Sequence, residues 1–280
     1  MDRTALRAAE LGANTYQIFS ASPRMWRAGL PDRQVGRRLA ALRKEHDLYP
    51  LVIHDNYLIN LAAADPGIRQ KSIAAFRGEI ERAMALGAEY LVAHPGSYRG
   101  QTREQGVATL VESLALAVDG LKCRGLMLLL ENTAGSGHAL GSRFEELAEI
   151  RERARRKVRL PIGYCLDTAH CLAAGYNIAA AGELCDTVLQ AERILGLEPV
   201  RVVHANDSKV PLGSRVDRHE HIGRGHIGME GFRRIVNHPK LRDKAFILET
   251  PIENDGDDRR NLETLKSLCR RRRTTIIRSS

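Results

Sequence analysis

Histidine and carboxylate side chains follow the ends of short apolar runs in this chain. The run Val200 to Val203 stops at His204, and Asp217 and His219 come shortly after it. Imidazole and carboxylate groups are common zinc ligands in proteins. The segment from His204 to His219 therefore predicts a metal-binding loop, provided that other parts of the chain supply further ligands.

Five other apolar runs end in the same way. The polar residues that directly follow them are His54, His94, Glu131, Asp167 and Glu249. A single histidine after a strand is more often a hydrogen-bonded structural residue than a ligand, but six such coincidences weigh against that interpretation. His170 lies three positions after Asp167, which places both side chains on one face at the start of a helix.

These positions form one set of candidate ligands spread over most of the chain. The set is His54, His94, Glu131, Asp167, His170, His204, Asp217, His219 and Glu249. One metal ion takes about four ligands, so the set predicts more than one ion, with at least one carboxylate shared between ions. Only the fold can bring residues so distant in sequence to one place.

Short apolar runs alternate with longer amphipathic segments. The runs that predict strands are Tyr16–Phe19, Leu51–Ile53, Tyr90–Ala93, Leu126–Leu130, Ile162–Leu166, Val200–Val203 and Phe246–Leu248. The segments that predict helices between them are Ile68–Leu86, Thr102–Leu121, Arg143–Arg155, Ala180–Leu195 and Met229–Asn237. This alternation is typical of a closed parallel barrel or a doubly wound sheet. In a barrel all strand carboxyl ends meet on one face, which would gather the candidate ligands in one pocket.

Length and charge limit the possible organisation and partners. The chain has 280 residues, 43% of them hydrophobic, which is enough to bury a large core. We expect one domain over residues 1–268 and a basic tail over 269–280, in which Arg270 to Arg273 could contact nucleic acid. The net charge of +9 favours an anionic partner, although an ordinary basic protein explains the charge equally well.

Cysteine usage and hydropathy favour a cytoplasmic protein. The five cysteines form no CxxC pair, and their odd number argues against a disulfide framework. Cys165 and Cys171 flank Asp167 and His170, but small buried side chains at a strand end are a better interpretation than ligands. No apolar stretch approaches the length of a membrane span, and the first residues lack the order of a signal peptide.

The order and composition of these motifs resemble the endonuclease IV family of apurinic/apyrimidinic endonucleases. The segments that carry the resemblance are His-Asp-Asn-Tyr-Leu-Ile-Asn-Leu from His54, His-Pro-Gly-Ser from His94, Glu-Asn-Thr-Ala-Gly from Glu131, Asp-Thr-Ala-His from Asp167, the stretch from His204 to His219, and Glu-Thr-Pro from Glu249. The resemblance extends from about residue 5 to residue 255. It implies an α/β fold of the (β/α)8 TIM-barrel type, a trinuclear zinc site, and a monomeric hydrolase that repairs abasic sites in double-stranded DNA.

The resemblance also implies how three Zn²⁺ ions would share the ligands at the barrel mouth. One ion would take His54, His94 and Glu131; the second Glu131, Asp167, His204 and Glu249; the third His170, Asp217 and His219. Glu131 would bridge two ions and is the predicted catalytic residue. Metal-activated water would attack the phosphorus 5′ to an abasic sugar and leave a 3′-hydroxyl and a 5′-deoxyribose phosphate. Manganese or iron could occupy some positions, because these ligands accept them too.

Other residues are expected to contact DNA. The resemblance places Arg24, Trp26 and Tyr57 on loops that enter the minor groove, where a planar side chain could fill the gap left by a flipped abasic nucleotide. Packing against a neighbouring helix explains Trp26 and Tyr57 equally well. The expected phosphate contacts, all in the ligand loop, are Lys209, Arg215 and Arg218. Three further histidines without such a context, His46, His138 and His238, are expected to be structural or surface residues.

Two features depart from the family pattern. Arg224 stands where the family usually has an acidic residue. His221 and His226 on either side of it could disturb the third ion, but loop histidines that face solvent are the better interpretation. In addition, Asp2 to Leu11 predicts a helix at the very start, so the first strand of the barrel is missing from this chain and seven strands remain. The unfilled gap would expose the edges of two strands, so we expect an upstream start or a truncation.

Two other functions stay open on the sequence. Related barrels with histidine and carboxylate metal sites isomerise or epimerise small sugars, but such sites usually need only one or two ions. A non-catalytic, zinc-bearing DNA-binding protein is the other alternative. A closed structural zinc site needs four strong ligands, however, and the third group offers three.

Overall fold

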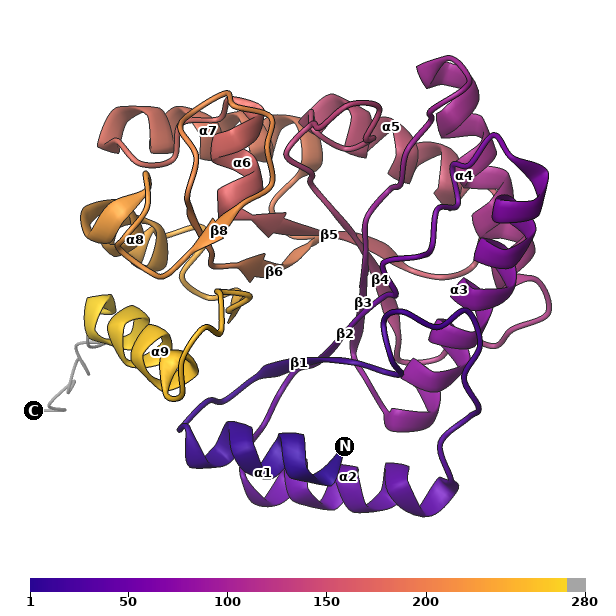
Figure 1. Ribbon diagram of the computed structural model, residues 1–280, viewed down its shortest axis with the longest axis horizontal. Helices are drawn as coiled ribbons and strands as arrows, with labels where there is room; N and C mark the ends of the chain where they lie inside the picture. The colour runs from indigo at the N-terminus through magenta and orange to yellow at the C-terminus, as the bar shows by residue number, and fades with distance from the viewer. Residues whose placement is uncertain (271–280) are drawn as a thin grey trace, which may run out of the picture.

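Seven parallel strands form the central sheet of the computed structural model, which describes residues 1–270 (Figure 1). In sheet order they are β1 (Tyr16–Phe19), β2 (Leu51–His54), β3 (Tyr90–Ala93), β4 (Met127–Glu131), β5 (Ile162–Asp167), β6 (Val200–His204) and β9 (Ala245–Ile247). Every strand predicted from the sequence is confirmed, and the ends agree to within one residue. The sheet curves into the wall of a TIM barrel.

Helices surround this wall on its outer side (Figure 1). They are α1 (Asp2–Glu10), α2 (Arg33–Glu45), α3 (Pro66–Leu86), α4 (Arg103–Val118), α5 (Phe144–Arg155), α6 (Thr168–Ala174), α7 (Ala181–Leu195), α8 (Gly228–Asn237) and α9 (Asp257–Leu268). The predicted helices are confirmed, whereas α2 and α9 were not foreseen. Their buried faces include polar residues, Arg43 in α2 and Asp257 and Asn261 in α9, which weaken the apolar periodicity.

Local signals in the sequence determine where several helices start and stop. The Asp65 carboxylate accepts a hydrogen bond from the backbone N–H of Ile68, Pro66 occupies the first turn of α3, and Gly87 ends that helix in the left-handed region at φ 69°. Thr102 and Gln105 form a capping box at the start of α4. These helices therefore return the chain to the amino end of the next strand at fixed points.

Alternate residues along the strands divide the core into two clusters. The cluster inside the barrel consists of Val52, Val92, Leu129, Cys165, Val202 and Ile247. The larger cluster, between the sheet and the helices, takes the neighbours of these residues, such as Leu51 and Ile53. Cys165 is thus a buried apolar residue of the interior, as expected.

The barrel wall is open between β1 and β9, which are not hydrogen-bonded to each other. A cavity of about 720 Å³ lies between these two strands and reaches the candidate ligands His54, His94 and His170. Within residues 1–270, the structure therefore has the seven-stranded wall that the sequence predicts. The polar side chain of Gln17 on β1 lines the same cavity.

The ligand loop carries two very short strands, β7 (Asp207–Ser208) and β8 (His219–Glu220), which pair antiparallel. The expected basic tail lies outside the described residues except for Cys269 and Arg270, and the backbone N–H of Arg270 donates to Asn237. No helix among residues 1–270 is both long and apolar enough to cross a membrane.

Candidate metal centre

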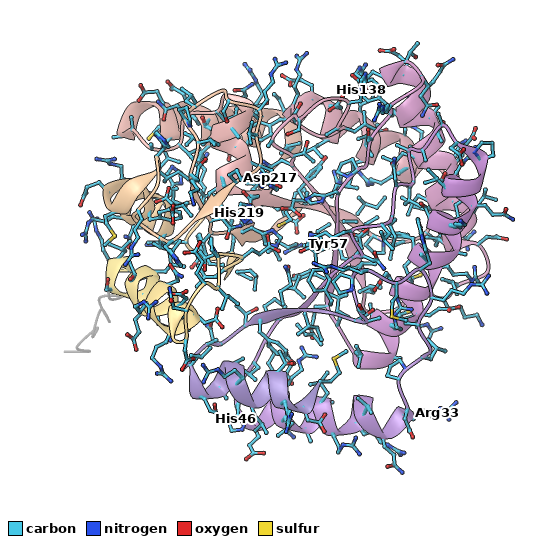
Figure 2. The ribbon with its side chains drawn as sticks, in the orientation of Figure 1. Arg33, His46, Tyr57, His138, Asp217 and His219 are labelled. Atoms are coloured by element: carbon cyan, nitrogen blue, oxygen red, sulfur yellow. The ribbon has the colours of Figure 1, made fainter. Side chains whose placement is uncertain are left out.

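The structure brings all of the candidate ligands to the carboxyl ends of the strands. His54, Glu131, Asp167 and His204 are the last residues of β2, β4, β5 and β6. His94 follows β3, and Glu249 lies just beyond β9. Figure 2 shows Asp217 and His219 near the centre of this view, with Tyr57 beside them. The parallel topology therefore assembles the six ligands at the strand ends, as the sequence predicts.

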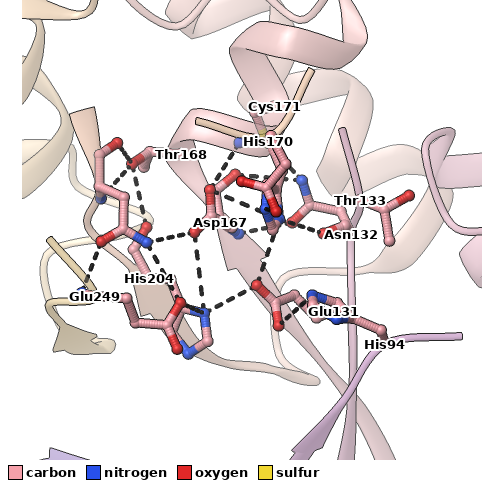
Figure 3. Close-up of polar contacts among 12 residues, drawn as sticks. His94, Glu131, Asn132, Thr133, Asp167, Thr168, His170, Cys171, His204 and Glu249 are labelled. Carbon is pink, nitrogen blue, oxygen red and sulfur yellow. Dashed lines mark hydrogen bonds and ion pairs between the residues drawn. The ribbon is translucent and has the colours of Figure 1, made fainter. Parts of the chain in front are cut away.

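Glu131 lies at the centre of the cluster and is fully buried (Figure 3). Its Oε2 is 3.1 Å from His54 Nε2 and 3.2 Å from His94 Nε2, whereas its Oε1 is 2.9 Å from His204 Nδ1 and 3.4 Å from His170 Nδ1. Burial alone would raise the pKa of Glu131, but the charges of His204 and His94 hold it well below its usual range. The carboxylate is thus ionised and offers one oxygen to each side.

The second group is built around His204, whose Nδ1 faces three carboxylates. It lies 2.9 Å from Glu131, 3.1 Å from Glu249 and 4.0 Å from Asp167. Asn206 holds two of these acids, since its Nδ2 donates to Asp167 Oδ2 at 2.6 Å and its Oδ1 accepts from the backbone N–H of Glu249 at 2.7 Å. Burial opposes ionisation of Glu249, yet His204 lowers its pKa to about 2.

The third group includes one more carboxylate than the sequence indicated. Asp217 Oδ2 is 3.2 Å from His170 Nε2, and Asp217 Oδ1 is 3.3 Å from His219 Nε2. Asp167 Oδ2 is 3.7 Å from the same His219 nitrogen. Asp167, His170 and His219 each offer a ligand atom within 4.8 Å of the others. Asp167 therefore lies between the second and third groups, a position that its separation from His219 in sequence did not reveal.

The short connection between β5 and α6 fixes Asp167 and His170 together. Asp167 ends β5 and also caps α6, because its Oδ1 accepts the backbone N–H of His170 at 2.7 Å. The other oxygen, Oδ2, accepts from Asn206 Nδ2 and faces His219 and His204 in the cluster. Asn132 supports the junction by accepting the backbone N–H of Asp167 on its side-chain oxygen at 2.6 Å.

The donor set and its unpaired nitrogens fit divalent cations. Within residues 1–270, the buried Nε2 atoms of His94, His170 and His219 form no hydrogen bond, although carboxylate oxygens lie 3.2–3.3 Å from them. Burial would lower the pKa of His54 and of His219, but the carboxylates outweigh it and raise both to about 9. Buried imidazoles and carboxylates that face one another in this way can exchange their protons for metal ions.

Several residues that hold the ligands were missed by the sequence reasoning. They are Gln17, Asn132, Thr168, Asn206 and Asp207. Asn132 and Asn206 follow ligands closely in sequence, and that proximity is a signal that could have identified them. Gln17 gave no signal, because β1 carries none of the predicted ligands.

Asp207 anchors the glycine-rich segment that follows His219. Its fully buried carboxylate accepts backbone N–H groups of Ser208, Gly223, Gly225, Ile227 and Gly228 at 2.8–3.2 Å. A Cβ atom on Gly225 would lie 2.3 Å from the carbonyl oxygen of Ser208. The glycines therefore let the backbone wrap closely around one buried charge.

Three residues that depart from the family pattern lie on the same glycine-rich segment after His219, namely Arg224, His221 and His226. Arg224 is exposed and lines a separate cavity of about 210 Å³ beside α9, which none of the candidate ligands lines. His221 Nδ1 is 2.9 Å from Asn261 Nδ2, and His226 is exposed. These contacts give no support to a disturbance of the third group, and the exposed His226 agrees with the solvent-facing position that the sequence favours for the two histidines.

The residues expected to contact DNA lie on loops at the same end of the strands. Tyr57 is 67% exposed, and its ring meets Phe19 edge-on at 5.2 Å between centroids, so it does not pack under a helix. Trp26 is partly buried, whereas the basic residues are exposed: Arg24, Lys209, Arg215 and Arg218. His46 and His138 lie at the edge of the molecule in Figure 2, far from Asp217 and His219. His238 caps the end of α8.

Comparison with known proteins gives matches over almost the whole chain. The family model described as a xylose isomerase-like TIM barrel matches residues 5–270. A protein named probable endonuclease 4 from Solibacter usitatus is 59% identical over 269 residues, which cover 96% of this chain and 93% of that protein. A protein of the same name from Chloroflexus aurantiacus is 42% identical over 270 residues, covering 96% and 94%.

Solved structures also match almost the whole chain. Endonuclease IV from Thermus thermophilus superposes with a TM-score of 0.83 at 40% identity, covering 95% of this chain and 93% of that chain. D-psicose 3-epimerase from Clostridium cellulolyticum has a TM-score of 0.67 at 14% identity, covering 95% and 91%, and shows a shared fold alone.

Proposed function

Because this chain belongs to the endonuclease IV family of xylose isomerase-like TIM barrels, we propose that it is a hydrolase, a phosphodiesterase that cuts double-stranded DNA at abasic sites in base excision repair. The observation that carries the proposal is the buried cluster of imidazoles and carboxylates around Glu131. Its members come from six strand ends, the first turn of α6 and the ligand loop, and they fit together as a site for several cations.

We propose that three Zn²⁺ ions occupy this cluster, with manganese or iron as possible replacements. His54, His94 and Glu131 would hold the first; Glu131, Asp167, His204 and Glu249 the second; His170, Asp217 and His219, with Asp167 close by, the third. Such ions, when bound, activate water near neutral pH and neutralise charge on phosphate oxygens. The expected products are a 3′-hydroxyl and a 5′-deoxyribose phosphate.

The protein's own residues would orient the DNA around this centre. Glu131 stays ionised, because imidazoles contact both of its oxygens. Exposed Arg24 and Tyr57, and partly buried Trp26, stand on the loops after β1 and β2, where a planar side chain can replace a flipped nucleotide in the stack. Exposed Lys209, Arg215 and Arg218 would bind phosphates. The monomeric state and the cytoplasmic location stay predictions.

The two alternative functions have weaker support. Likeness to the sugar epimerases is confined to the fold, since identity to D-psicose 3-epimerase is 14%. A closed structural zinc site is at odds with the cavity of about 720 Å³ that reaches His54, His94, His170, Asp217 and His219. An open coordination position is what a catalytic site requires.

One assay tests the endonuclease function against the DNA-binding alternative. Metal-replete protein is given a duplex with a single abasic site, with and without a chelator, beside the Glu131→Gln variant and the surface control Glu152→Gln. We expect cleavage 5′ to the lesion that the chelator abolishes and that Glu131→Gln lowers by about 10³-fold, because several kcal/mol of charge stabilisation are lost. Cleavage that survives the Glu131 change would refute the bridging role. Tight binding without any cleavage would make the protein a DNA-binding protein instead.

A further inference from the structure

Gln17 reaches the metal cluster from the one strand of the seven-stranded sheet that supplies no candidate ligand. Its neighbours in sequence, Tyr16 and Ile18, pack into the outer core, so the Gln17 side chain points to the barrel interior. Gln17 is also in register with Val52, a member of the interior cluster. The Gln17 side chain is partly buried there and lines the open cavity.

Both the oxygen and the NH₂ group of the Gln17 side-chain amide have a hydrogen-bond partner. Gln17 Oε1 lies 2.9 Å from His204 Nε2, and Gln17 Nε2 lies 2.5 Å from Glu249 Oε1. A carboxylate can only accept a hydrogen bond, so the NH₂ group must face Glu249 and the amide oxygen must face His204. The reverse orientation would set two oxygens against each other. Because the amide oxygen can only accept, His204 must carry a proton on Nε2, which leaves Nδ1 as the nitrogen that a metal ion can take.

His204 is oriented differently from three other histidines of the cluster. In His54, His170 and His219 the Nδ1 atom lies 2.9–3.0 Å from a backbone carbonyl oxygen, and Nε2 is the ring nitrogen nearest to a carboxylate. The His204 ring has the reverse orientation, so that its Nδ1 atom faces Glu131 and Glu249. The outer partner of His204 is therefore a side chain, which a single substitution can remove.

We propose that Gln17 is a positioning residue of the metal centre, which sets the tautomer of His204 and holds Glu249 against it. This inference rests on the proposed metal site. Partners that donate to or accept from the far side of a ligand histidine fix its orientation and raise metal affinity, and their loss costs about 10- to 100-fold. Gln17 holds two ligands of the second group at once, His204 and Glu249.

Two variants and one control test the role. Gln17→Met keeps the length of the side chain and removes both hydrogen bonds. Gln17→Glu keeps an acceptor for His204 but turns a carboxylate toward Glu249. Thr15→Val is the control, because Thr15 lies only two residues before Gln17, just outside β1, and its side-chain hydrogen bond goes to the carbonyl oxygen of Pro50 and not to a candidate ligand. Metal affinity is measured by competition with a chelator, and the visible absorption of the Co²⁺-substituted protein reports the ligand geometry.

We expect Gln17→Met to weaken binding of one ion about 10- to 100-fold, to alter the cobalt spectrum, and to lower kcat on abasic DNA with KM unchanged. Gln17→Glu should weaken the binding of the same ion, because two carboxylates then face each other. Thr15→Val should match the wild type. Unchanged affinity and spectrum in Gln17→Met, or an equal loss in Thr15→Val, would overturn the proposal. The metal measurements need no DNA, so wild-type protein that fails to cut abasic DNA would refute the proposed function alone.

Discussion

At the residue level, the cluster alternates acids and bases so that each charge has several partners. Glu131 contacts His54 and His94 on one side and His170 and His204 on the other. Without metal, protons must supply the positive charge, which is why the carboxylates raise the pKa of His54 to about 9 despite its burial. Metal ions and protons therefore compete for the same nitrogens.

This competition predicts different effects of pH on the stability of the metal-free and the metal-replete protein. His54 and His219 have pKa values of about 9 in the metal-free fold against 6.5 for the ordinary group. Their contribution to stability is present below pH 6.5 and disappears as pH rises through about 9. Thermal unfolding should therefore show a falling midpoint for chelator-treated protein over this range. The metal-replete protein should hold its midpoint, because metal affinity rises with pH. A midpoint of the metal-free protein that rises with pH would contradict the assignment.

At the level of the elements, the loops that surround the site are tied to buried charges. Asp207 organises the segment after β8 by accepting backbone N–H groups of three glycines. On the opposite side, the buried pair Glu79 and Arg82 of α3 holds the loop after β1. Arg82 donates to Ser20 Oγ at 2.7 Å and to the carbonyl oxygen of Ala28 at 3.3 Å. The flanking loops are therefore positioned from within the structure.

A pair of glycine substitutions tests the segment that Asp207 holds. Gly225→Ala places a Cβ atom 2.3 Å from Ser208 O and 2.6 Å from Asp207 Oδ1, so the backbone must shift. We expect a loss of about 2 kcal/mol in the free energy of unfolding. Gly182→Ala is the control, since a Cβ atom there, in α7, meets nothing within 4 Å, and it should stabilise by about 0.5 kcal/mol. Urea unfolding measures both, and equal effects would refute the role of the close contact.

A double-mutant cycle tests the buried pair in α3. Glu79→Gln leaves the Arg82 charge buried without its partner and should cost about 3 kcal/mol in the free energy of unfolding. Adding Arg82→Met removes the stranded charge, so the double variant should recover part of that loss. If the double variant loses more stability than the single variants Glu79→Gln and Arg82→Met lose together, the two side chains do not stabilise the fold as a pair.

At the level of the whole molecule, net positive charge and an open mouth favour a long anionic partner. The chain carries a net charge of +9, and exposed basic side chains stand on the loops around the metal cluster. Exposed apolar residues gather on the same loops, among them Met25, Leu30, Tyr57, Leu212, Val216 and Ile252. Apolar and basic groups together suit a duplex whose stack is opened at one step.

The salt dependence of DNA binding tests this view of the surface. The affinity should fall steeply with salt, and each phosphate contact contributes a slope of about −0.9 in a double-logarithmic plot. Lys209→Ala and Arg218→Ala should each reduce the slope by about 0.9. Arg156→Ala, at the carboxyl end of α5 and so at the opposite end of the barrel, should leave the slope unchanged. Fluorescence anisotropy with an abasic duplex measures the slopes, and equal slopes for all proteins would exclude phosphate contacts by the ligand loop.

The sequence by itself determined the strands and the identity of the candidate ligands. Apolar runs define the parallel strands, and topology requires residues at their carboxyl ends, such as His54, Glu131 and His204, to meet. The helices α2 and α9 escaped prediction because polar residues occupy part of their buried faces.

Only the tertiary structure decided how these side chains are grouped and held. The position of Asp167 between two groups follows from the path of the loop that returns His219 to the cluster. Contacts of Gln17 with His204 and Glu249 join residues 187 and 232 positions apart. Such contacts depend on strand curvature, loop path and rotamer, and no periodicity in the sequence records them, because each involves a single pair of atoms across the barrel.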